Sequence, residues 1–423
     1  MADSYSLRLH STWMLYGQGI AVAFQALYFI LIGRTLGSNE YGAFVGVVAL
    51  VNVLSQFSSL GMEMILVRNI SRDPSTFAPT WGMALRVSIY GFVVLLMIAM
   101  LIGHLTLPPQ LQVLIPYIAL SDGLLGKLVQ LGSRAFQGAR QLGNTAKLTA
   151  LTNATRAVAA LALFVFAQFK HVRPSVQMWT KIYWMSSLVT ATIALLMVTR
   201  LLGRPRFKRM STRELVDGLS FSLSSSSIST YNDIDKTLLA SSGQVYAAGI
   251  YSAAYRIIDV ASVPIYAIYT AASPQFFQDG KRGIRHSIPL ANRLLKRTIP
   301  YGLIFAVSLF VASPLVPYLF GRSFEGSIVA LRWLCLLPLI RGLHYAWGTA
   351  ITGSSSQWYR TGTQLCAAIF NVALNAFLIP RWSWHGAAIA SLLTDGLLAA
   401  SSWIVVRWLW TKETNRHVAT QTV

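Results

Sequence analysis

The sequence has few charged residues for its length. Only 12% of its 423 residues are charged, whereas about a quarter of the residues in a typical soluble domain are. Hydrophobic residues make up 54% of the chain, and the mean hydropathy is +0.52. This composition excludes a soluble globular protein and predicts a polytopic membrane protein.

Cysteine and the common enzyme motifs are also scarce. Cys335 and Cys366 are the two cysteines, and both fall in apolar runs without CxxC spacing, so we expect neither a disulfide framework nor a metal site. The sequence contains no P-loop, no GxGxxG after a strand, no HExxH and no GxSxG. No catalytic residue is predicted, and we expect a protein that is not an enzyme.

Acidic residues are rare compared with basic ones. There are 14 Asp and Glu against 35 Lys and Arg, which gives a net charge of +21. In a soluble chain this excess would suggest a nucleic-acid partner. Here the basic residues lie in the loops between apolar runs, which is the positive-inside pattern of membrane proteins, so no nucleic acid is expected.

Long apolar runs are the main feature that is present. A spanning helix needs about 20 mostly apolar residues, and twelve runs meet this rule. They cover residues 14–33, 41–62, 82–105, 113–133, 148–168, 177–199, 216–240, 247–274, 298–320, 326–346, 361–379 and 385–406. If both termini are cytoplasmic, most Lys and Arg fall on the inner side of the membrane. Adding or removing one middle span would destroy this asymmetry, which supports the count of twelve.

The chain divides into two similar halves. The longest basic loop, 200–213, follows the sixth span, so we predict an N-lobe of residues 1–203, a basic cytoplasmic linker of 204–214 and a C-lobe of 215–423. The start of the second span, YGAF from Tyr41, is echoed by AGIY from Ala248 at the start of the eighth. Six spans per half, each half starting inside, indicate a parallel repeat, which is a known transporter plan with a site near the midplane.

Charged residues inside the spans are the candidate functional residues. Each costs roughly 2.5 to 3.5 kcal/mol at the centre of a membrane helix. Those deep in the spans are Asp122, Arg156, Asp233, Asp235, Lys236, Arg256, Asp259 and Asp395, while Lys181 and Arg332 lie nearer the outer surface. Arg156 has no acidic residue at helical spacing, so we expect it to be unpaired and to bind an anion, since guanidinium suits phosphate oxygens.

The other charges offer partners within the sequence. Arg256 and Asp259 are three residues apart, so they share a helix face, and either an ion pair or a ligand explains them. Asp235 and Lys236 are adjacent and point to different faces, so at least one is expected to find a partner elsewhere, such as across the lobe interface. Arg341 and His344, near the inner end of the tenth span, are expected to snorkel to the surface, with a proton step as the alternative.

Four stretches carry a family resemblance. They are GRTLGSNEYGAF with SSLGMEMILVRNISRD, then NDIDKTLLASSGQVYAAGIYSAAYRI, LFGRSFEGSIVALRWLC and NVALNAFLIPRWSWHGAAIASLLTD. In their order and spacing they resemble the polysaccharide transporters, or Wzx-type O-antigen flippases, of the MOP superfamily. The resemblance implies an all-α polytopic fold of about 12 transmembrane helices in two six-helix lobes, MATE-like, in a bacterial inner membrane.

The resemblance also implies an activity. Such proteins translocate an undecaprenyl-diphosphate-linked oligosaccharide, such as an O-antigen repeat unit of lipopolysaccharide, to the periplasmic leaflet by alternating access through a cationic central cavity. Arg156, Arg256 and Lys236 are then the predicted substrate-binding residues. The acidic residues Asp235, Asp259, Asp395 and Asp122 are predicted to tune these charges or to take a coupling ion, H⁺ or Na⁺. No other cofactor is expected. Membrane lipids and other membrane proteins of polysaccharide assembly are the expected partners.

Two alternatives stay open. One is a MATE-like small-molecule exporter, which is disfavoured because the first span offers only Gln18 and Gln25 where drug exporters generally carry an acidic residue. The other is a non-transport partner or enzyme of polysaccharide assembly, for which the loops are too short to form an extramembrane domain. A lipid II flippase is also disfavoured, because such flippases have two further spans and no apolar run long enough for them follows residue 406.

Overall fold

The computed structural model describes residues 2–354 and 356–421, and the side chains of 19–354 and 356–415. The side chain of Gln18 therefore lies outside the described residues. Contacts divide the chain into two compact units. Unit 1 comprises Met1–Ser229, Leu239–Gly249 and Leu319–Gly321; unit 2 comprises Thr230–Leu238, Ile250–Tyr318 and Arg322–Val423.

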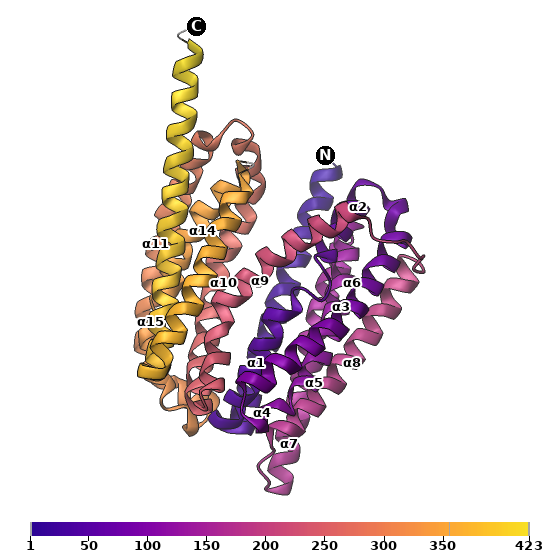
Figure 1. Ribbon diagram of the computed structural model, residues 1–423, viewed down its shortest axis with the longest axis vertical. Helices are drawn as coiled ribbons and strands as arrows, with labels where there is room; N and C mark the ends of the chain where they lie inside the picture. The colour runs from indigo at the N-terminus through magenta and orange to yellow at the C-terminus, as the bar shows by residue number, and fades with distance from the viewer. Residues whose placement is uncertain (1, 355, 422–423) are drawn as a thin grey trace. The chain divides into compact units, whose positions relative to one another are not determined.

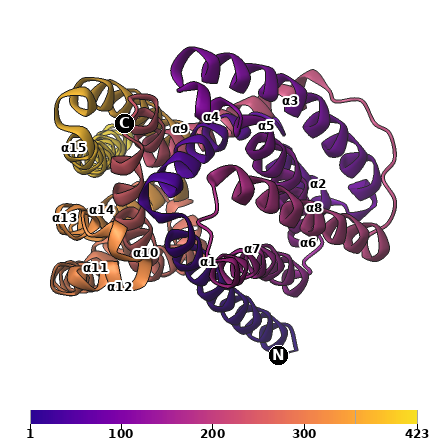
Figure 2. The ribbon, with the colours of Figure 1, turned by 90° about the horizontal axis from the view of Figure 1, so that it is seen from below.

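Unit 1 is a helical bundle. Its helices are α1 (Ala2–Ser55), α2 (Met62–Arg72), the 3-10 turn η1 (Pro74–Thr76), α3 (Phe77–Thr106), α4 (Pro109–Gln112), α5 (Ile115–Ile118), the π-helical η2 (Ala119–Gly126), α6 (Lys127–Gly138), α7 (Leu142–Lys170), α8 (Val176–Leu201) and the first part of α9 (Thr212–Ser241). In Figures 1 and 2, α6, α7 and α8 lie side by side within this unit.

Unit 2 is a second helical bundle. Its elements are the middle of α9, most of α10 (Val245–Gly280), α11 (Ile284–Ala312), η3 (Ser313–Leu315), most of α12 (Val316–Phe320), η4 (Arg322–Phe324), α13 (Ser327–Leu334), α14 (Leu337–Gly353) and α15 (Gln357–Gln421). The helices α11, α14 and α15 pack together, and the C-terminal part of α15 continues past the ends of the other two (Figure 1).

The helices α1 and α15 each hold two predicted spans. The first is interrupted at Gly37, where φ is 75° and ψ is 173°, and the second at Ser383, where φ is 53°. A positive φ is costly for residues with a Cβ but not for glycine. Both interruptions fall in predicted outer loops, between spans 1 and 2 and between spans 11 and 12.

Nine helical segments of the described residues are long and apolar enough to span a membrane. Two of them, within α1 and α15, contain two predicted spans each. The helix α9 is not among the nine, because a run of four serines (224–227) and six charged residues make it polar. Counting two spans in each interrupted helix and adding α9 gives twelve, in agreement with the prediction.

Each unit has its own apolar core. In unit 1 the core lies between α2, α3, α6 and α8, with the fully buried side chains Leu66, Trp81 and Phe136. In unit 2 it lies between α10, α11, α14 and α15 and includes Phe276 and Ile351. These cores fix the helices that carry the charged residues described below.

Unit 1 gathers two short segments from late in the chain. Arg34 donates from Nε to the carbonyl of Leu319 at 2.7 Å. The start of α10 packs on α1 so closely that a Cβ on Gly42 would lie 1.9 Å from the Val245 carbonyl oxygen, and a Cβ on Gly249 would lie 2.0 Å from that of Ser38. No side chain fits at such distances, so both positions require glycine, as in other tightly packed membrane helices.

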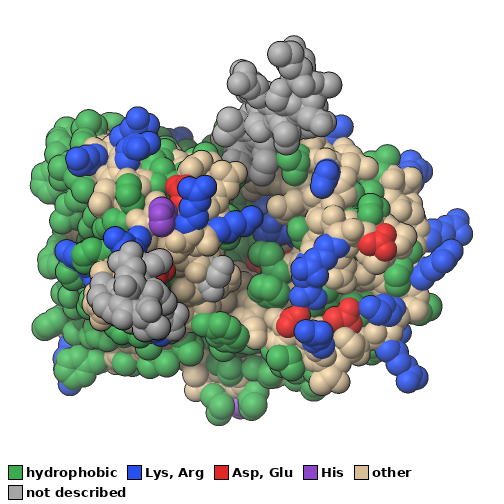
Figure 3. Space-filling model, turned by 90° about the horizontal axis from the view of Figure 1, so that it is seen from above, with side chains coloured by type: hydrophobic (Ala, Val, Ile, Leu, Met, Phe, Trp, Pro, Cys, Tyr) green, Lys and Arg blue, Asp and Glu red, His purple; other side chains and the backbone are tan. Residues whose placement is uncertain are grey.

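Basic side chains gather at one end of unit 1. This end carries α2 and the linker between α8 and α9, and Figure 3 shows many Lys and Arg side chains over it. The linker is held to α3, because the Arg206 amide donates to the Ala78 carbonyl at 2.8 Å and the Arg86 guanidinium donates to the Lys208 carbonyl at 2.6 Å. The charge pattern predicts that this end faces the cytoplasm.

Candidate functional site

Arg156 on α7 has an acidic partner. Its guanidinium donates to Asp122 at 2.8 Å, and Tyr183 on α8 donates its hydroxyl to the same carboxylate oxygen at 2.7 Å. The guanidinium also lies over the Tyr183 ring, 4.8 Å from its centroid. The expectation of an unpaired Arg156 is therefore wrong. Asp122 is 34 residues away on another helix, so helical spacing within one span could not reveal it.

Asp122 belongs to a π-helical segment. The segment η2 covers Ala119–Gly126 inside the predicted fourth span. π-Helical turns are rare and occur frequently at functional sites. Side chains in such a turn leave the α-helical register, and here the Asp122 carboxylate reaches both α7 and α8.

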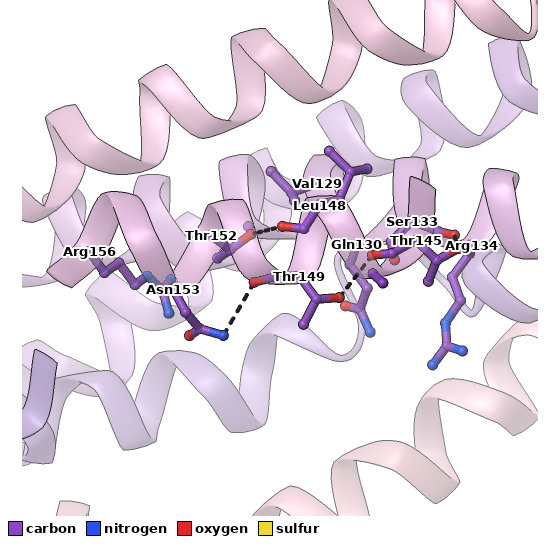
Figure 4. Close-up of a pocket in the computed structure, with 12 residues that line it drawn as sticks. Val129, Gln130, Ser133, Arg134, Thr145, Leu148, Thr149, Thr152, Asn153 and Arg156 are labelled. Carbon is purple, nitrogen blue, oxygen red and sulfur yellow. Dashed lines mark hydrogen bonds between the residues drawn. The ribbon is translucent and has the colours of Figure 1, made fainter. Parts of the chain in front are cut away.

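A cavity of about 430 Å³ adjoins this pair within unit 1. It lies between α6 and α7, and Figure 4 shows Arg156 and Arg134 at its two ends. The polar residues along it are Gln130, Ser133 and Arg134 from α6 and Thr145, Thr149, Thr152, Asn153 and Arg156 from α7. Among the described residues that line this cavity, two are arginines and none is acidic.

The polar residues of α7 form one stripe. Thr145, Thr149, Thr152 and Arg156 are spaced by four, three and four residues, so they share a helix face. At 1.5 Å per residue the stripe is roughly 16 Å long. The spacing of these threonines can be seen in the sequence, but a search for charged residues alone does not find them.

The threonine hydroxyls of the stripe already donate to backbone carbonyls. Thr152 donates to Leu148 at 2.8 Å, and Thr145 donates across to Ser133 on α6 at 3.1 Å. A hydroxyl that donates once still has oxygen lone pairs that can accept. The cavity therefore offers hydrogen-bond acceptors along the stripe and a guanidinium donor at each end, Arg156 on α7 and Arg134 on α6.

Lys236 is paired on its own helix. Its ammonium lies 3.1 Å from Asp233 and 3.3 Å from Asp235, and it also donates to the Asn232 carbonyl. The other oxygen of Asp235 accepts from the Tyr251 hydroxyl at 2.6 Å. The long lysine side chain folds back onto both carboxylates of its own helix. The expectation that at least one of the two adjacent residues finds a partner elsewhere is confirmed for Asp235, which accepts from Tyr251 on α10 and from Ser391 on α15.

A chain of ion pairs continues through unit 2. Arg256 and Asp259 form the pair that their spacing predicts, at 3.5 Å, and Asp259 also accepts from Arg341 at 3.1 Å. Arg341 lies 3.5 Å from Asp395 and donates to the Tyr255 hydroxyl at 2.6 Å. The expectation that Arg341 snorkels to the surface is wrong, because only 6% of its side chain is exposed.

His344 lies one turn beyond Arg341 on α14. Its Nε2 atom is 3.9 Å from Oδ1 of Asp395. That oxygen is buried and has no hydrogen-bond partner among the described residues. The expectation that His344 reaches the surface is also wrong, because its side chain is only 11% exposed.

A cavity of about 290 Å³ lies beside these charges within unit 2. It lies between α9, α10 and α14. Its lining residues are Asn232, Asp233, Tyr255, Arg256, Asp259, Ser262, Val263, Tyr266, Arg341 and Tyr345. Two acidic and two basic side chains line it, so their formal charges cancel.

The predicted site residues thus fall into three groups. Arg156 lines the cavity of unit 1, with Asp122 bound to it. Arg256 and Asp259 line the cavity of unit 2. Three residues are buried next to that second cavity without lining it: Asp235, Lys236 and Asp395.

Comparison with known proteins identifies the family. Residues 9–278, more than half of the chain, match the family model described as polysaccharide biosynthesis protein. The chain belongs to the polysaccharide biosynthesis protein family. No curated protein matches the sequence. The predicted family resemblance is confirmed at this level.

The fold is similar to solved MATE structures. One is the inward-facing conformation of a multidrug resistance MATE family transporter of the MOP superfamily, with a TM-score of 0.69, 16% identity and 95% of each chain covered. Another is an outward-facing conformation, with a TM-score of 0.62, 17% identity and 96% of each chain covered. A third is a MOP superfamily transporter from Pyrococcus furiosus described by the reverse polarity of its binding pocket, with a TM-score of 0.60, 16% identity and coverages of 94% and 95%.

These similarities establish the fold class. The protein is an all-α, multi-pass membrane protein with a MATE-like fold, as predicted. Family and fold together support a membrane transporter.

Proposed function

We propose that this protein is a flippase that moves an undecaprenyl-diphosphate-linked oligosaccharide, such as an O-antigen repeat unit, from the cytoplasmic to the periplasmic leaflet of a bacterial inner membrane. The proposed mechanism is alternating access, without chemical change of the lipid. The family and the MATE-like fold support transport linked to polysaccharide biosynthesis. The observation that carries the choice of substrate is the cavity of unit 1, where the described lining residues include two arginines and a polar stripe but no carboxylate.

The arginines suit the diphosphate. A hydrophilic head group must cross about 30 Å of hydrocarbon, and its charge needs cationic partners along the way. Guanidinium binds phosphate oxygens in a bidentate geometry. Arg134 and Arg156 lie at opposite ends of the cavity (Figure 4), so the diphosphate can pass from one to the other.

Asp122 makes the Arg156 site reversible. Its carboxylate competes with phosphate for the guanidinium. When Arg156 turns to the substrate, the hydrogen bond from Tyr183 still stabilises the carboxylate. When the substrate leaves, the ion pair forms again. This exchange keeps the binding of the diphosphate from becoming too tight for release.

The coupling ion is proposed to act in unit 2. The Oδ1 atom of Asp395 lies close to His344 and has no hydrogen-bond partner in the part of the chain that the structure describes, which supports a site that takes up H⁺ or Na⁺. Asp235 and Asp259 are proposed to tune this site through Tyr251 and Arg341. We propose that Arg256 contacts the sugars of the head group, whereas Lys236, which is 1% exposed, acts through Asp233 at the cavity wall.

The test uses sealed proteoliposomes with a labelled undecaprenyl-diphosphate oligosaccharide. We expect protein-dependent movement of label between leaflets, and a loss of about tenfold to a hundredfold in Arg156→Gln, because hydrogen bonds to charged groups contribute about 1.5–3 kcal/mol. Lys147→Gln is the matched control, because this cation lies on α7, is exposed and does not line the cavity.

Three other outcomes would redirect the assignment. Chemical conversion of the lipid in detergent would support an enzyme of polysaccharide assembly. Efflux of organic cations without lipid movement would support an exporter. Lipid movement that Arg156→Gln leaves intact would keep the flippase but remove Arg156 from its site.

A further inference from the structure

The cavity of unit 2 differs in chemistry from that of unit 1, and it has no role in holding the diphosphate described above. We propose that it binds a sugar ring of the substrate through hydroxyl hydrogen bonds and a tyrosine face, and that it sets which repeat unit the protein carries. This inference rests on the proposed function, because it places the sugar part of the same lipid-linked substrate in a second pocket, separate from the one that holds the diphosphate.

The charges of this cavity are already paired. Asp259 lies between two guanidiniums, 3.5 Å from Arg256 and 3.1 Å from Arg341. Asp233 is paired with Lys236 at 3.1 Å. A diphosphate would have to displace these carboxylates, so the cavity is poorly suited to an anion of that charge.

Paired charges still offer many hydrogen-bonding positions. A carboxylate can accept about four hydrogen bonds and a guanidinium can donate five. A sugar hydroxyl both donates and accepts, so it can bridge the two without adding charge. Asp259 is the most accessible of these groups, with 38% of its side chain exposed, and Asn232 adds an amide to the same wall.

Tyrosine rings supply the second element of sugar binding. Tyr266 is 57% exposed and meets Tyr345 edge to face, with ring centroids 5.7 Å apart. The C–H face of a pyranose ring is apolar and packs against such an aromatic surface in the way other apolar groups do. Tyr266 is therefore placed to hold a sugar ring while its hydroxyls reach the paired charges.

Tyr255 in the wall of the pocket is held by several contacts. Tyr255 is buried, its hydroxyl accepts from Arg341, and its ring centroid is 4.2 Å from the Lys236 ammonium. Polar groups that are held in place in this way lose little entropy when a ligand binds. A site built to hydrogen-bond hydroxyls also rejects analogues that lack them, by up to about 10⁴–10⁵-fold. Its volume of about 290 Å³ is at the small end of the range for ligand pockets, so it fits part of an oligosaccharide.

The first experiment measures sugar preference. Full-length protein in proteoliposomes is offered undecaprenyl-diphosphate carriers that bear glucose, galactose, N-acetylglucosamine or a 6-deoxyhexose, in pairwise competition. We expect the native protein to prefer one sugar and Tyr266→Ala to reduce that preference about tenfold. Tyr266→Phe keeps the ring, so its sugar preference is expected to lie between those of the native protein and Tyr266→Ala. Tyr246→Ala is the matched control, because Tyr246 is 45% exposed on the same helix and does not line the cavity.

The second experiment removes transport from the readout. Methyl glycosides of the same four sugars, which carry no diphosphate, are added to the purified protein in detergent, and thermal unfolding is followed. A ligand that binds only the folded state raises the unfolding temperature. We expect the preferred sugar to do so for the native protein and Tyr246→Ala, but not for Tyr266→Ala or Asp259→Asn.

The two experiments separate the two proposals. Glycoside stabilisation that is lost in Tyr266→Ala, without any lipid movement, would support the sugar site while the flippase proposal fails. Lipid movement with the same sugar preference in the native protein, Tyr266→Ala and Asp259→Asn would overturn the sugar site and keep the flippase. Absence of both stabilisation and preference in the native protein would also overturn the sugar site.

Discussion

The two units carry the same three chemical groups in different arrangements. In unit 1, Arg156 and Tyr183 both donate to Asp122. In unit 2, Arg341 donates both to Asp259 and to the Tyr255 hydroxyl. The Arg341 guanidinium carbon lies 5.1 Å from the centroid of the Tyr255 ring, and the Arg156 guanidinium carbon lies 4.8 Å from that of Tyr183.

Burial separates the roles of the two arginines. Arg341 is 6% exposed and bridges several partners, whereas Arg156 is 23% exposed and faces a cavity with no carboxylate among its described lining residues. We therefore propose that Arg341 serves the structure and that Arg156 serves a ligand, because the two arginines differ in the number of their partners and in their accessibility.

The largest expected effect is on stability, in Arg341→Ala. This change leaves Asp259 without one of its two guanidiniums and Asp395 without its only cation among the described residues, apart from His344 if that is protonated. Removing one partner of a buried ion pair typically costs about 3–5 kcal/mol. We expect a large fall in the unfolding temperature in detergent, and a clearly smaller fall in Arg156→Ala. Equal falls would contradict the division into a structural and a ligand-facing arginine.

The next effect is on substrate affinity, in Asp122→Asn. Asparagine can still accept the Tyr183 hydrogen bond but no longer competes as a charge for Arg156. We expect diphosphate binding, measured by competition with inorganic pyrophosphate, to tighten severalfold while release slows. Unchanged affinity would show that the ion pair does not oppose substrate binding. Asp217→Asn, which removes an ion pair with Arg68 away from the cavity, is the matched control.

A smaller effect is expected from Thr149→Val in the α7 stripe. The substitution keeps the shape and removes one hydroxyl acceptor, worth about 0.5–1.5 kcal/mol for a neutral hydrogen bond. Lipid translocation should fall about twofold to tenfold. Thr192→Val, at an exposed threonine on α8 that also donates to its own helix, should leave the rate unchanged. A full rate in Thr149→Val would remove the stripe from the substrate path.

The smallest effect concerns pH and lies outside both cavities. Burial raises the pKa of Glu214, but hydrogen bonds from Ser211 and Lys208 outweigh it and hold this pKa below its ordinary value. A carboxylate with a lowered pKa stabilises the fold above its unfolded pKa, and this contribution disappears as the pH falls through the folded pKa. Glu214→Gln should therefore lower the unfolding temperature slightly at pH 7, on the scale of a surface ion pair of about 0.2–1 kcal/mol. The difference from the native protein should vanish in acid, and both cavities should keep their ligands.

Sequence reasoning found the helices because each apolar run depends only on its own residues. It also found the Arg256–Asp259 pair, whose members share one turn. It missed Asp122 as the partner of Arg156, because this ion pair depends on how separate helices pack. The carboxylate also lies in a π-helical turn, which no local sequence pattern predicts. Arg341 was misplaced for the same reason, since its partners lie on α10 and α15.

The composition of unit 1 has a consequence for the order in which the chain folds during synthesis. The unit includes Leu239–Gly249 and Leu319–Gly321, which are made after most of its helices. At about 5–20 residues per second, the 92 residues between the end of its main segment at Ser229 and the end of its last piece at Gly321 take roughly 5 to 18 seconds to translate. The residues that pack against Gly42, 245–249, are made early in this interval, whereas Leu319, which accepts from Arg34, is made at its end. The contacts of unit 1 are therefore complete only after residues 250–318 of unit 2 have been synthesised.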